Sequence, residues 1–532
     1  MSVTKRLRAI AGVSLMALAS ALGGGVAAAP ALAAPPSPGA ADRGDPLFPG
    51  LGNGGYDVGH YTLDLTYAST APAQTVPAVV SVRARATQAL SRFDLDFRGD
   101  SVDSVAVDGD PATFSREGEE LVITPAEPID DSQPFVVRVA YSSGPQEITP
   151  GEEGDLNAVL AKAWFGTPSG SITAAQPNGA HRIFPCNDVP SDPATYTVRA
   201  STPAESSFVA NGELTHTSTA DGRTQWTYEE REPMASELIQ LAFGSLAVRD
   251  RGSVGGVRLR DVAPANQIDA LEPALRRAPD HLDWLTGKVG RYPFRTYGSL
   301  VSDTGLPFAL ETQTISLYGS WLFLPSANGR YGNPDYYEPT MVHELAHQWF
   351  GDDVMPARWS DVWLNEGHAT WYEWEYSQER GDPAFYLKGG SFEGQMRRTY
   401  AFGDQRRAEF GPVAAPVHGA DDVSGLFNPN VYGGGALVLY ALRQVVGDRA
   451  FRAIERGWPR RFGGGPASTA DFIAFASAVA HQDLTKFLTD WLYGTKIPPM
   501  PGHPDWTVDP VGAAPPASSA FGPGWMSGPL LR

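Results

Sequence analysis

The sequence predicts a multi-domain α+β protein in which an antiparallel β domain precedes a mainly helical domain. The chain has 532 residues, more than one hydrophobic core usually organises. From about residue 47 to 250, hydrophobic side chains alternate with polar ones, whereas after about 255 they recur at helical spacing. A β half followed by a helical half is typical of the α+β class.

Residues 47–250 are expected to form the antiparallel β domain. Tyr61–Tyr67 and Val80–Arg85 alternate hydrophobic and polar side chains, and Phe135–Val139 is rich in β-branched residues. Strands with this pattern bury one face and leave the other toward solvent. Asp221-Gly222 supplies the kind of turn that joins antiparallel neighbours.

Residues 251–500 are expected to be mainly helical. The helical patterns cover residues 268–287, 339–350, 365–380, 433–446 and 470–492. Residues 501–532 are rich in Pro, Gly, Ala and Ser. Such a composition favours a surface tail over a further core element.

The N-terminal segment has the pattern of an export signal. Lys5, Arg6 and Arg8 precede a mostly apolar run, and Ala31–Ala33 forms an A-x-A cleavage site. We therefore expect residues 1–33 to be a signal peptide cleaved after Ala33, followed by a Pro/Ala/Gly/Asp-rich linker over residues 34–46. The alternative is a membrane anchor, but the run is rich in small residues, and nowhere else does the chain have about 18 consecutive apolar residues. A secreted or extracytoplasmic protein without a stable membrane span is the prediction.

Charge and cysteine content exclude several classes of function. The chain has 41 basic and 60 acidic residues, a formal net charge of -19. Nucleic-acid binding requires clustered Lys and Arg, so we expect no nucleic-acid partner. The single cysteine, Cys186, excludes an internal disulfide and a cysteine-based zinc cluster. Any metal site must therefore use histidines and carboxylates.

The segment around His343-Glu344-Leu345-Ala346-His347 matches the H-E-x-x-H motif. Two histidines four residues apart on a helix lie on the same face, one turn apart, so both rings can reach one zinc ion. Glu344 lies beside the first ligand and can take a proton from water without binding the metal. The alternative is an ordinary amphipathic helix whose histidines are only hydrogen-bonded.

A second motif, Asn365-Glu366-Gly367, favours zinc over that alternative. Eighteen residues separate Glu366 from His347, and Glu366 is predicted to lie at the start of a second helix. Two imidazoles and one carboxylate leave a zinc ion with an open coordination position, which is typical of catalytic sites. His368 is interpreted as a packing or surface residue because the ligand count is already filled.

H-E-L-A-H followed after eighteen residues by the Glu of N-E-G resembles the gluzincin aminopeptidases of the aminopeptidase N / leukotriene hydrolase family. The resemblance covers about residues 47–500. It implies a thermolysin-like catalytic domain and zinc-dependent release of N-terminal residues from peptides with a free N-terminus. One zinc ion would be held by His343, His347 and Glu366, with Glu344 as general acid and base.

The same resemblance implies three further site residues. Tyr432 of Tyr432-Gly-Gly-Gly-Ala stands where the family has a catalytic tyrosine, and would donate a hydrogen bond to the oxyanion. Glu311 of Phe308-Ala-Leu-Glu311-Thr312 corresponds to the glutamate of the Gly-Ala-Met-Glu-Asn signature and would bind the substrate ammonium, with Gln176 as its neutral partner. The alternatives are a turn tyrosine and a solvated strand-end carboxylate.

The sequence also departs from the family pattern. Phe308 replaces the usual Gly, Thr312 the usual Asn, and Gly434 the usual Lys after the tyrosine. The chain is also expected to lack the large helical C-terminal domain that many members carry. Two alternative functions therefore stay open: a zinc endopeptidase with the same ligands, and a catalytically silent peptide-binding protein.

Overall fold

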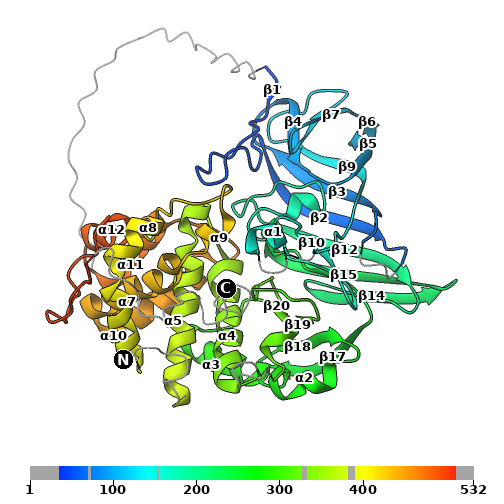
Figure 1. The fold of residues 1–532 in the computed structure, drawn as a ribbon. Coiled ribbons are helices and arrows are strands. Elements are labelled where there is room, and N and C mark those ends of the chain that lie inside the picture. The colour runs from blue at the N-terminus through cyan, green and yellow to red at the C-terminus, as the bar shows by residue number, and fades with distance from the viewer. Residues whose placement is uncertain are drawn as a thin grey trace, which may run out of the picture. The chain divides into compact units, whose positions relative to one another are not determined.

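The computed structural model describes residues 35–69, 73–149, 151–152, 155–325, 332–381 and 390–510. The described residues from Pro36 onward form one compact unit. The predicted signal peptide, residues 1–33, lies outside the described residues, as do residues 511–532 of the predicted tail. The first half is rich in strands and the second in helices (Figure 1), which confirms the α+β prediction.

An eight-stranded sheet forms the largest part of the β domain. Its order is β14-β15-β12-β2-β3-β9-β5-β6. The strands are β2 Tyr56–Thr66, β3 Val76–Ala86, β5 Ser101–Val107, β6 Asp110–Pro111, β9 Pro134–Ser143, β12 Ala194–Pro203, β14 Glu213–Ala220 and β15 Arg223–Met234. Neighbours pair antiparallel as predicted, except that β12 runs parallel to β2. The turn at Asp221-Gly222 joins β14 to β15.

Two four-stranded sheets complete the β domain. One has the order β10-β11-β16-β13 and the other β1-β4-β8-β7. Their strands are β10 Trp164–Thr167, β11 Gly170–Thr173, β13 Ser207–Ala210 and β16 Leu241–Gly244, then β1 Ser37–Pro38, β4 Leu90–Asp96, β7 Thr113–Glu117 and β8 Glu120–Thr124. The linker prediction for residues 34–46 is therefore wrong in part, because β1 lies in it and pairs with β4. A proline is tolerated there because β1 is an edge strand.

The helical half begins with a small sheet of order β17-β18-β19-β20. Its strands are β17 Leu246–Val254, β18 Val257–Pro264, β19 Thr296–Ser302 and β20 Ser316–Gly319, and β21 Val354–Pro356 pairs separately with β22 Gly465–Ala467. β17 crosses the predicted boundary at residue 250, and its pairing with β18 assigns it to this sheet.

The helices agree with the predicted patterns in position but differ in their limits. They are α1 Leu156–Leu160, α2 Ile268–Leu275, α3 Ala278–Val289, α4 Pro334–His347, α5 Trp363–Arg380, α7 Phe392–Ala401, α8 Gly403–Phe410, α9 Val423–Leu426, α10 Gly435–Phe462, α11 Thr469–Ala480 and α12 Thr485–Tyr493. Short helical segments are η1 Ala180–Arg182, η2 Ser236–Leu238, η3 Ser320–Leu322, η4 Gln348–Asp352, η5 Trp359–Asp361 and η6 Asn430–Gly434.

Local chemistry explains where those limits differ. The predicted helix over 268–287 is two helices, and Pro279 lies in the first turn of the second, where a proline is favoured. The helix predicted over 470–492 is also two helices, because α11 ends at Ala480, its C-cap residue His481 has a positive φ of 51°, and α12 begins at Thr485. Residues 501–510 of the predicted tail lie mostly at the surface, with Trp506 buried and its ring stacked on that of Tyr440, centroids 5.8 Å apart.

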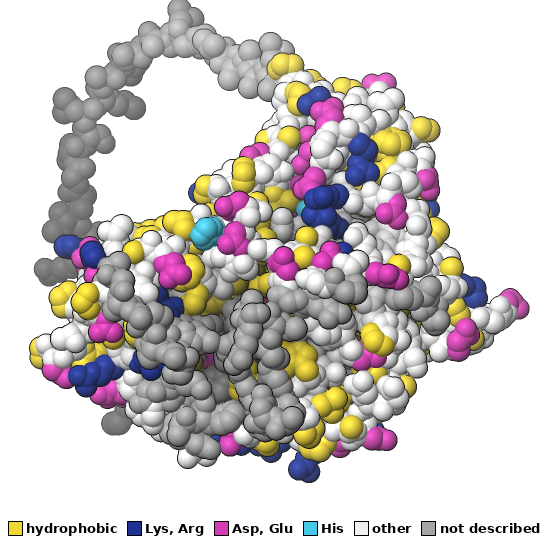
Figure 2. Space-filling model, in the orientation of Figure 1, with side chains coloured by type: hydrophobic (Ala, Val, Ile, Leu, Met, Phe, Trp, Pro, Cys, Tyr) yellow, Lys and Arg dark blue, Asp and Glu magenta, His cyan; other side chains and the backbone are white. Residues whose placement is uncertain are grey.

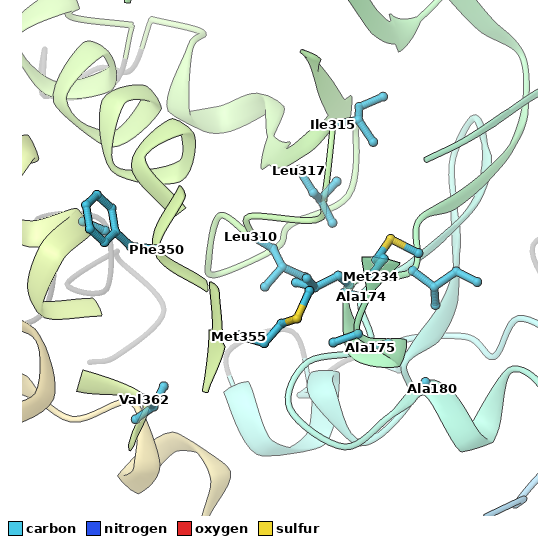
Figure 3. Packing of buried hydrophobic residues seen from close by; sticks show 14 of the residues in the cluster. Ala174, Ala175, Ala180, Met234, Leu310, Ile315, Leu317, Phe350, Met355 and Val362 are labelled. Atoms are coloured by element: carbon cyan, nitrogen blue, oxygen red, sulfur yellow. The ribbon is translucent and has the colours of Figure 1, made fainter. Parts of the chain in front are cut away.

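One hydrophobic cluster runs through both halves of the described chain. Figure 3 shows part of it, including Ala174 and Met234 of the β domain with Leu310 and Met355 of the helical half. Acidic and basic side chains are interspersed over the face drawn in Figure 2. Among the described residues no helix has the length and apolar character that a membrane span requires.

Candidate zinc site and substrate pocket

Helix α4 presents the two motif histidines. It begins at Pro334, five residues earlier than predicted from Pro339. Asn333 caps it, its side-chain oxygen accepting a hydrogen bond from the backbone N–H of Asp335 at 3.0 Å, and Pro334 occupies the first turn. Pro339 therefore lies inside the helix. The imidazole rings of His343 and His347 leave the same side of α4, with centroids 4.8 Å apart.

Glu366, in the first turn of α5, meets both rings. Its Oε2 lies 3.2 Å from Nε2 of His343 and 3.4 Å from Nε2 of His347. One donor atom from each residue lies within 4.8 Å of the other two, and all three side chains are buried. The structure thus brings the three predicted ligands together with one nitrogen of each ring facing the carboxylate.

The second nitrogen of each ring, Nδ1, faces away from the Glu366 carboxylate and has a partner of its own. Nδ1 of His343 lies 2.9 Å from Oε2 of Glu373, and Nδ1 of His347 lies 3.2 Å from the carbonyl oxygen of Phe350. A carboxylate and a carbonyl accept a proton from Nδ1, which leaves the Nε2 lone pair free to bind a metal. The donor set, its convergence and this orientation fit zinc.

Glu373 is a further residue of the site that the sequence motifs did not predict. It lies seven residues after Glu366, which is two turns along α5 and the same face of that helix. The i+7 spacing was therefore a signal in the sequence. Glu375 and Glu379 lie nearby on α5 but bind Lys288 instead.

Burial and neighbouring charges set the protonation of this group. Burial lowers the pKa of His343, but Glu373 and Glu366 outweigh that effect and raise it well above its usual value. Burial raises the pKa of Glu366, yet the two histidines lower it to about 2. Burial also raises the pKa of Glu344, to about 8. Tyr432 is fully buried, which raises its pKa and keeps its phenol protonated at neutral pH.

One pocket contains all the predicted site residues. It is lined by His343, Glu344, His347, Glu366, Glu311, Gln176, Tyr432, Leu156, Leu160, Phe308, Ala309, Leu310 and Phe427. Oε1 of Glu344 is buried without a hydrogen-bond partner among the described residues. An unpartnered carboxylate oxygen in this position is available to accept a proton from a bound water or substrate. The ring of Tyr432 stacks on that of His343 with centroids 5.9 Å apart.

Glu311 and Gln176 form a pair at the edge of the metal-binding group. Glu311 comes from the loop between β19 and β20, and Gln176 from the β domain after β11. Nε2 of Gln176 donates a hydrogen bond of 2.6 Å to Oε1 of Glu311, which is 4.0 Å from Nδ1 of His347. The two halves of the chain therefore place a buried carboxylate beside the metal ligands.

The apolar side of the pocket is closed by a contact between the two halves. Leu156 and Leu160 come from α1, and Phe427 follows α9. Asn157 joins these elements, because its side chain donates to Oδ1 of Asp422 at 3.0 Å and accepts from the backbone N–H of Ser424 at 2.8 Å. This contact was not predicted, since it joins residues more than 260 positions apart.

His368 takes no part in the metal-binding group. Its ring stacks on Phe350 with centroids 4.3 Å apart, and Nδ1 lies 2.7 Å from the carbonyl oxygen of Leu364. The packing interpretation of His368 is confirmed. Cys186 is likewise buried, as a small apolar residue would be.

Comparison with solved structures finds the same architecture. An M1 zinc metallopeptidase from Deinococcus radiodurans superposes with a TM-score of 0.71 and 28% identity, over 86% of this chain and 99% of that one. A two-domain M1 zinc metallopeptidase bound to L-arginine superposes with a TM-score of 0.70.

The matches to curated relatives cover a smaller part of this chain than the matches to solved structures do. Aminopeptidase N from Lactococcus lactis is 27% identical over 335 residues, which is 61% of this chain and 38% of that protein. Aminopeptidase M1-D from Oryza sativa is 24% identical over 341 residues, or 61% of this chain and 37% of its own length. The chain spans well under half the length of these two relatives.

Family models match both halves. A model described as the Peptidase M1 N-terminal domain matches residues 58–238, and one described as the Peptidase family M1 domain matches residues 282–491. The second match contains both histidines of the motif and Glu366. Together the two matches cover most of the chain, and the chain belongs to peptidase family M1.

Proposed function

We propose that this chain is a secreted zinc-dependent aminopeptidase that binds one zinc ion and releases N-terminal residues from peptides with a free N-terminus. The observation that carries the proposal is the position of Glu311, paired with Gln176, beside the three metal ligands in one pocket. A carboxylate in that position binds an α-ammonium group by a charge-assisted hydrogen bond. The first peptide bond of the substrate then lies near the metal ligands.

His343, His347 and Glu366 would hold the zinc ion, which when bound supplies Lewis-acid chemistry by polarising the scissile carbonyl and acidifying water. Glu344 accepts the proton of the attacking water and delivers one to the leaving amine. Tyr432, protonated in its buried setting, donates a hydrogen bond to the developing oxyanion. Removing such a donor costs about 3–4 kcal/mol of transition-state stabilisation.

The relatives support this choice of reaction. A Glu-to-Ala variant of the Deinococcus radiodurans enzyme is described as bound to a Tyr-Ser-Ala substrate, and several curated relatives are named aminopeptidases. Here the pocket offers apolar side chains around Glu311, from Leu156, Leu160, Phe308 and Phe427. Peptides with a free N-terminus fit both features.

The test compares an unblocked tripeptide with its N-acetylated form. We expect zinc-dependent release of the first residue from the free peptide, little cleavage of the acetylated one, and loss of turnover in Glu344→Gln. Equal cleavage of both peptides would favour an endopeptidase, and stoichiometric zinc with no turnover of any peptide would favour a binding protein. Export is tested separately by sequencing the N-terminus of protein from the medium, which should begin at Ala34.

A further inference from the structure

Gln348 is a buried residue that the motif leaves without a role. It follows the metal ligand His347 directly, at the point where α4 ends and η4 begins. Its side chain is fully buried. A buried amide offers two donors and two acceptor lone pairs, and each must find a partner.

All four hydrogen-bonding positions of this amide are used. Nε2 donates to the backbone carbonyl oxygen of Glu311 at 3.0 Å and to Oδ2 of Asp352 at 2.6 Å. Oε1 accepts from the backbone N–H of Thr314 at 2.8 Å and from the hydroxyl of Tyr292 at 3.1 Å. The acceptors on one side and the donors on the other define the orientation of the amide.

Two of these bonds hold the segment that carries Glu311. The carbonyl of residue 311 and the N–H of residue 314 both bind the one amide, and the N–H of Ile315 bonds to the carbonyl of Thr312 at 3.0 Å, so the segment is a closed turn. Other hydrogen bonds join the turn to the β domain. Gln176 donates to the carboxylate of Glu311, and the hydroxyl of Thr312 donates to the side-chain oxygen of Gln240. Gln348 instead joins the turn to the helix of the metal ligands.

We propose that Gln348 is a positioning residue that sets the distance between the ammonium-binding carboxylate of Glu311 and the metal ligands of α4. The inference rests on the proposed aminopeptidase function. The peptide bond that is cut must lie one residue from the ammonium group, so an anchor that moves relative to the ligands misplaces that bond. Gln348 adjoins the ligand His347 and binds the backbone of Glu311, so it sets the distance between Glu311 and the metal ligands. It does so without lining the pocket itself.

The experiment measures peptide binding in the Glu344→Gln background, where no turnover occurs. Calorimetry compares Leu-Gly-Gly with N-acetyl-Leu-Gly-Gly on the zinc-loaded full chain, with and without Gln348→Met, which has a similar length and no amide. With Gln348 in place we expect at least about tenfold tighter binding of the free peptide, because acetylation removes the charge and two of the three N–H donors of the ammonium group proposed to bind Glu311. Gln348→Met should reduce that preference to about threefold or less while zinc stoichiometry stays at its original value.

Controls separate positioning from general stability. Asn53→Ala removes a fully buried amide of the β domain whose Nδ2 donates to Oε2 of Glu120 at 3.2 Å, outside the pocket lining, and should leave the preference intact. If Gln348→Met keeps the wild-type preference while its melting temperature falls as in Asn53→Ala, Gln348 is only structural and the inference is wrong. Should Gln348→Met not fold, Gln348→Glu replaces it, since the carboxylate keeps an acceptor for Thr314 and loses the donor to Glu311.

The outcome also distinguishes this inference from the proposed function. If the background protein itself binds free and acetylated peptides equally, then Glu311 does not anchor an ammonium group and both proposals fail. If the background protein prefers the free peptide and Gln348→Met preserves that preference unchanged, the aminopeptidase proposal stands and the positioning role is rejected.

Discussion

Gly367 of α5 lies directly against Gly435, the first residue of α10. A Cβ atom at position 367 would be 2.9 Å from both Cα and C of Gly435, whereas carbon atoms in favourable contact are about 3.5–4.0 Å apart. Both of these atoms belong to the backbone and cannot rotate away. Gly367→Ala must therefore separate the two helices by roughly 0.5–1 Å. The separation moves Glu366 away from Tyr432, which precedes Gly435 by three residues.

The size of the effect follows from two opposing terms. Overpacking of this kind lowers the free energy of unfolding by about 1–3 kcal/mol. Alanine in place of glycine within a helix raises it by about 1 kcal/mol. We expect a net loss of up to about 2 kcal/mol in the free energy of unfolding. A displacement near 1 Å in the site can lower kcat by about 100-fold. Activity should therefore fall far more than stability.

The matched control is Gly287→Ala in α3. A Cβ at position 287 meets no atom within 4 Å, so this substitution should keep activity and leave stability unchanged or raise it by about 0.5–1 kcal/mol. Urea unfolding gives the stability of both variants, and turnover of an unblocked dipeptide gives kcat. Equal stability and equal kcat for the two variants would refute the argument that close contact at Gly367 positions Glu366.

Three further substitutions test the site and the α4 helix that carries it. Glu373→Gln should weaken zinc affinity about 10-fold to 100-fold, because Nδ1 of His343 loses its carboxylate partner; competition with a chelator measures it, and unchanged affinity would contradict the orienting role. Burial raises the pKa of Glu338, but hydrogen bonds from His281 and Tyr376 and the charge of Arg380 lower it to about 2, from an ordinary value of 4.5. A carboxylate whose pKa is lower in the folded than in the unfolded state stabilises the fold at pH values above its unfolded-state pKa, and this contribution is lost as the pH falls toward the folded-state pKa. Glu338→Gln should therefore lower the free energy of unfolding by about 2 kcal/mol at pH 7, after allowance for the partly exposed arginines, and by less at pH 3. Urea unfolding at the two pH values measures the difference. Asn157→Ala should raise KM about fivefold with little change in kcat, since it removes hydrogen bonds worth about 1 kcal/mol between α1 and α9; an unchanged KM would mean that this contact does not shape the pocket.

The parts of the site that local spacing controls could be predicted from the sequence. His343 and His347 lie on one face because a helix repeats every 3.6 residues, and Glu366 begins a second helix as expected. The sequence also contained a local signal for the early start of α4, because an Asn and a Pro at positions 333 and 334 are typical of a helix N-terminus. The prediction began five residues late because it used Pro339 instead.

The rest depends on which elements meet in space. Helical spacing places Glu373 on the same face of α5 as Glu366, but only the packing of α4 against α5 brings its carboxylate to Nδ1 of His343. Asn157 could not be paired with Asp422 because nothing local to α1 identifies a partner in the other half of the chain. The linker prediction was wrong in part for the same reason, since composition describes chain flexibility and not whether a strand such as β4 accepts a partner.

Carboxylates outnumber cations around this pocket, and that imbalance connects the fold to the proposed chemistry. Glu311, Glu344, Glu366 and Glu373 are all buried around two imidazoles. Buried carboxylates are costly unless a cation or hydrogen bonds compensate them. Two protonated histidines balance at most two of these four carboxylates, so the surplus is relieved either by protonation of Glu344, whose pKa is about 8, or by further cations. A divalent ion at the three ligands and an ammonium group at Glu311 would supply the missing positive charge at two adjacent points. The acidic surplus of the pocket therefore supports both proposals, a zinc ion at the three ligands and a free N-terminal ammonium group at Glu311.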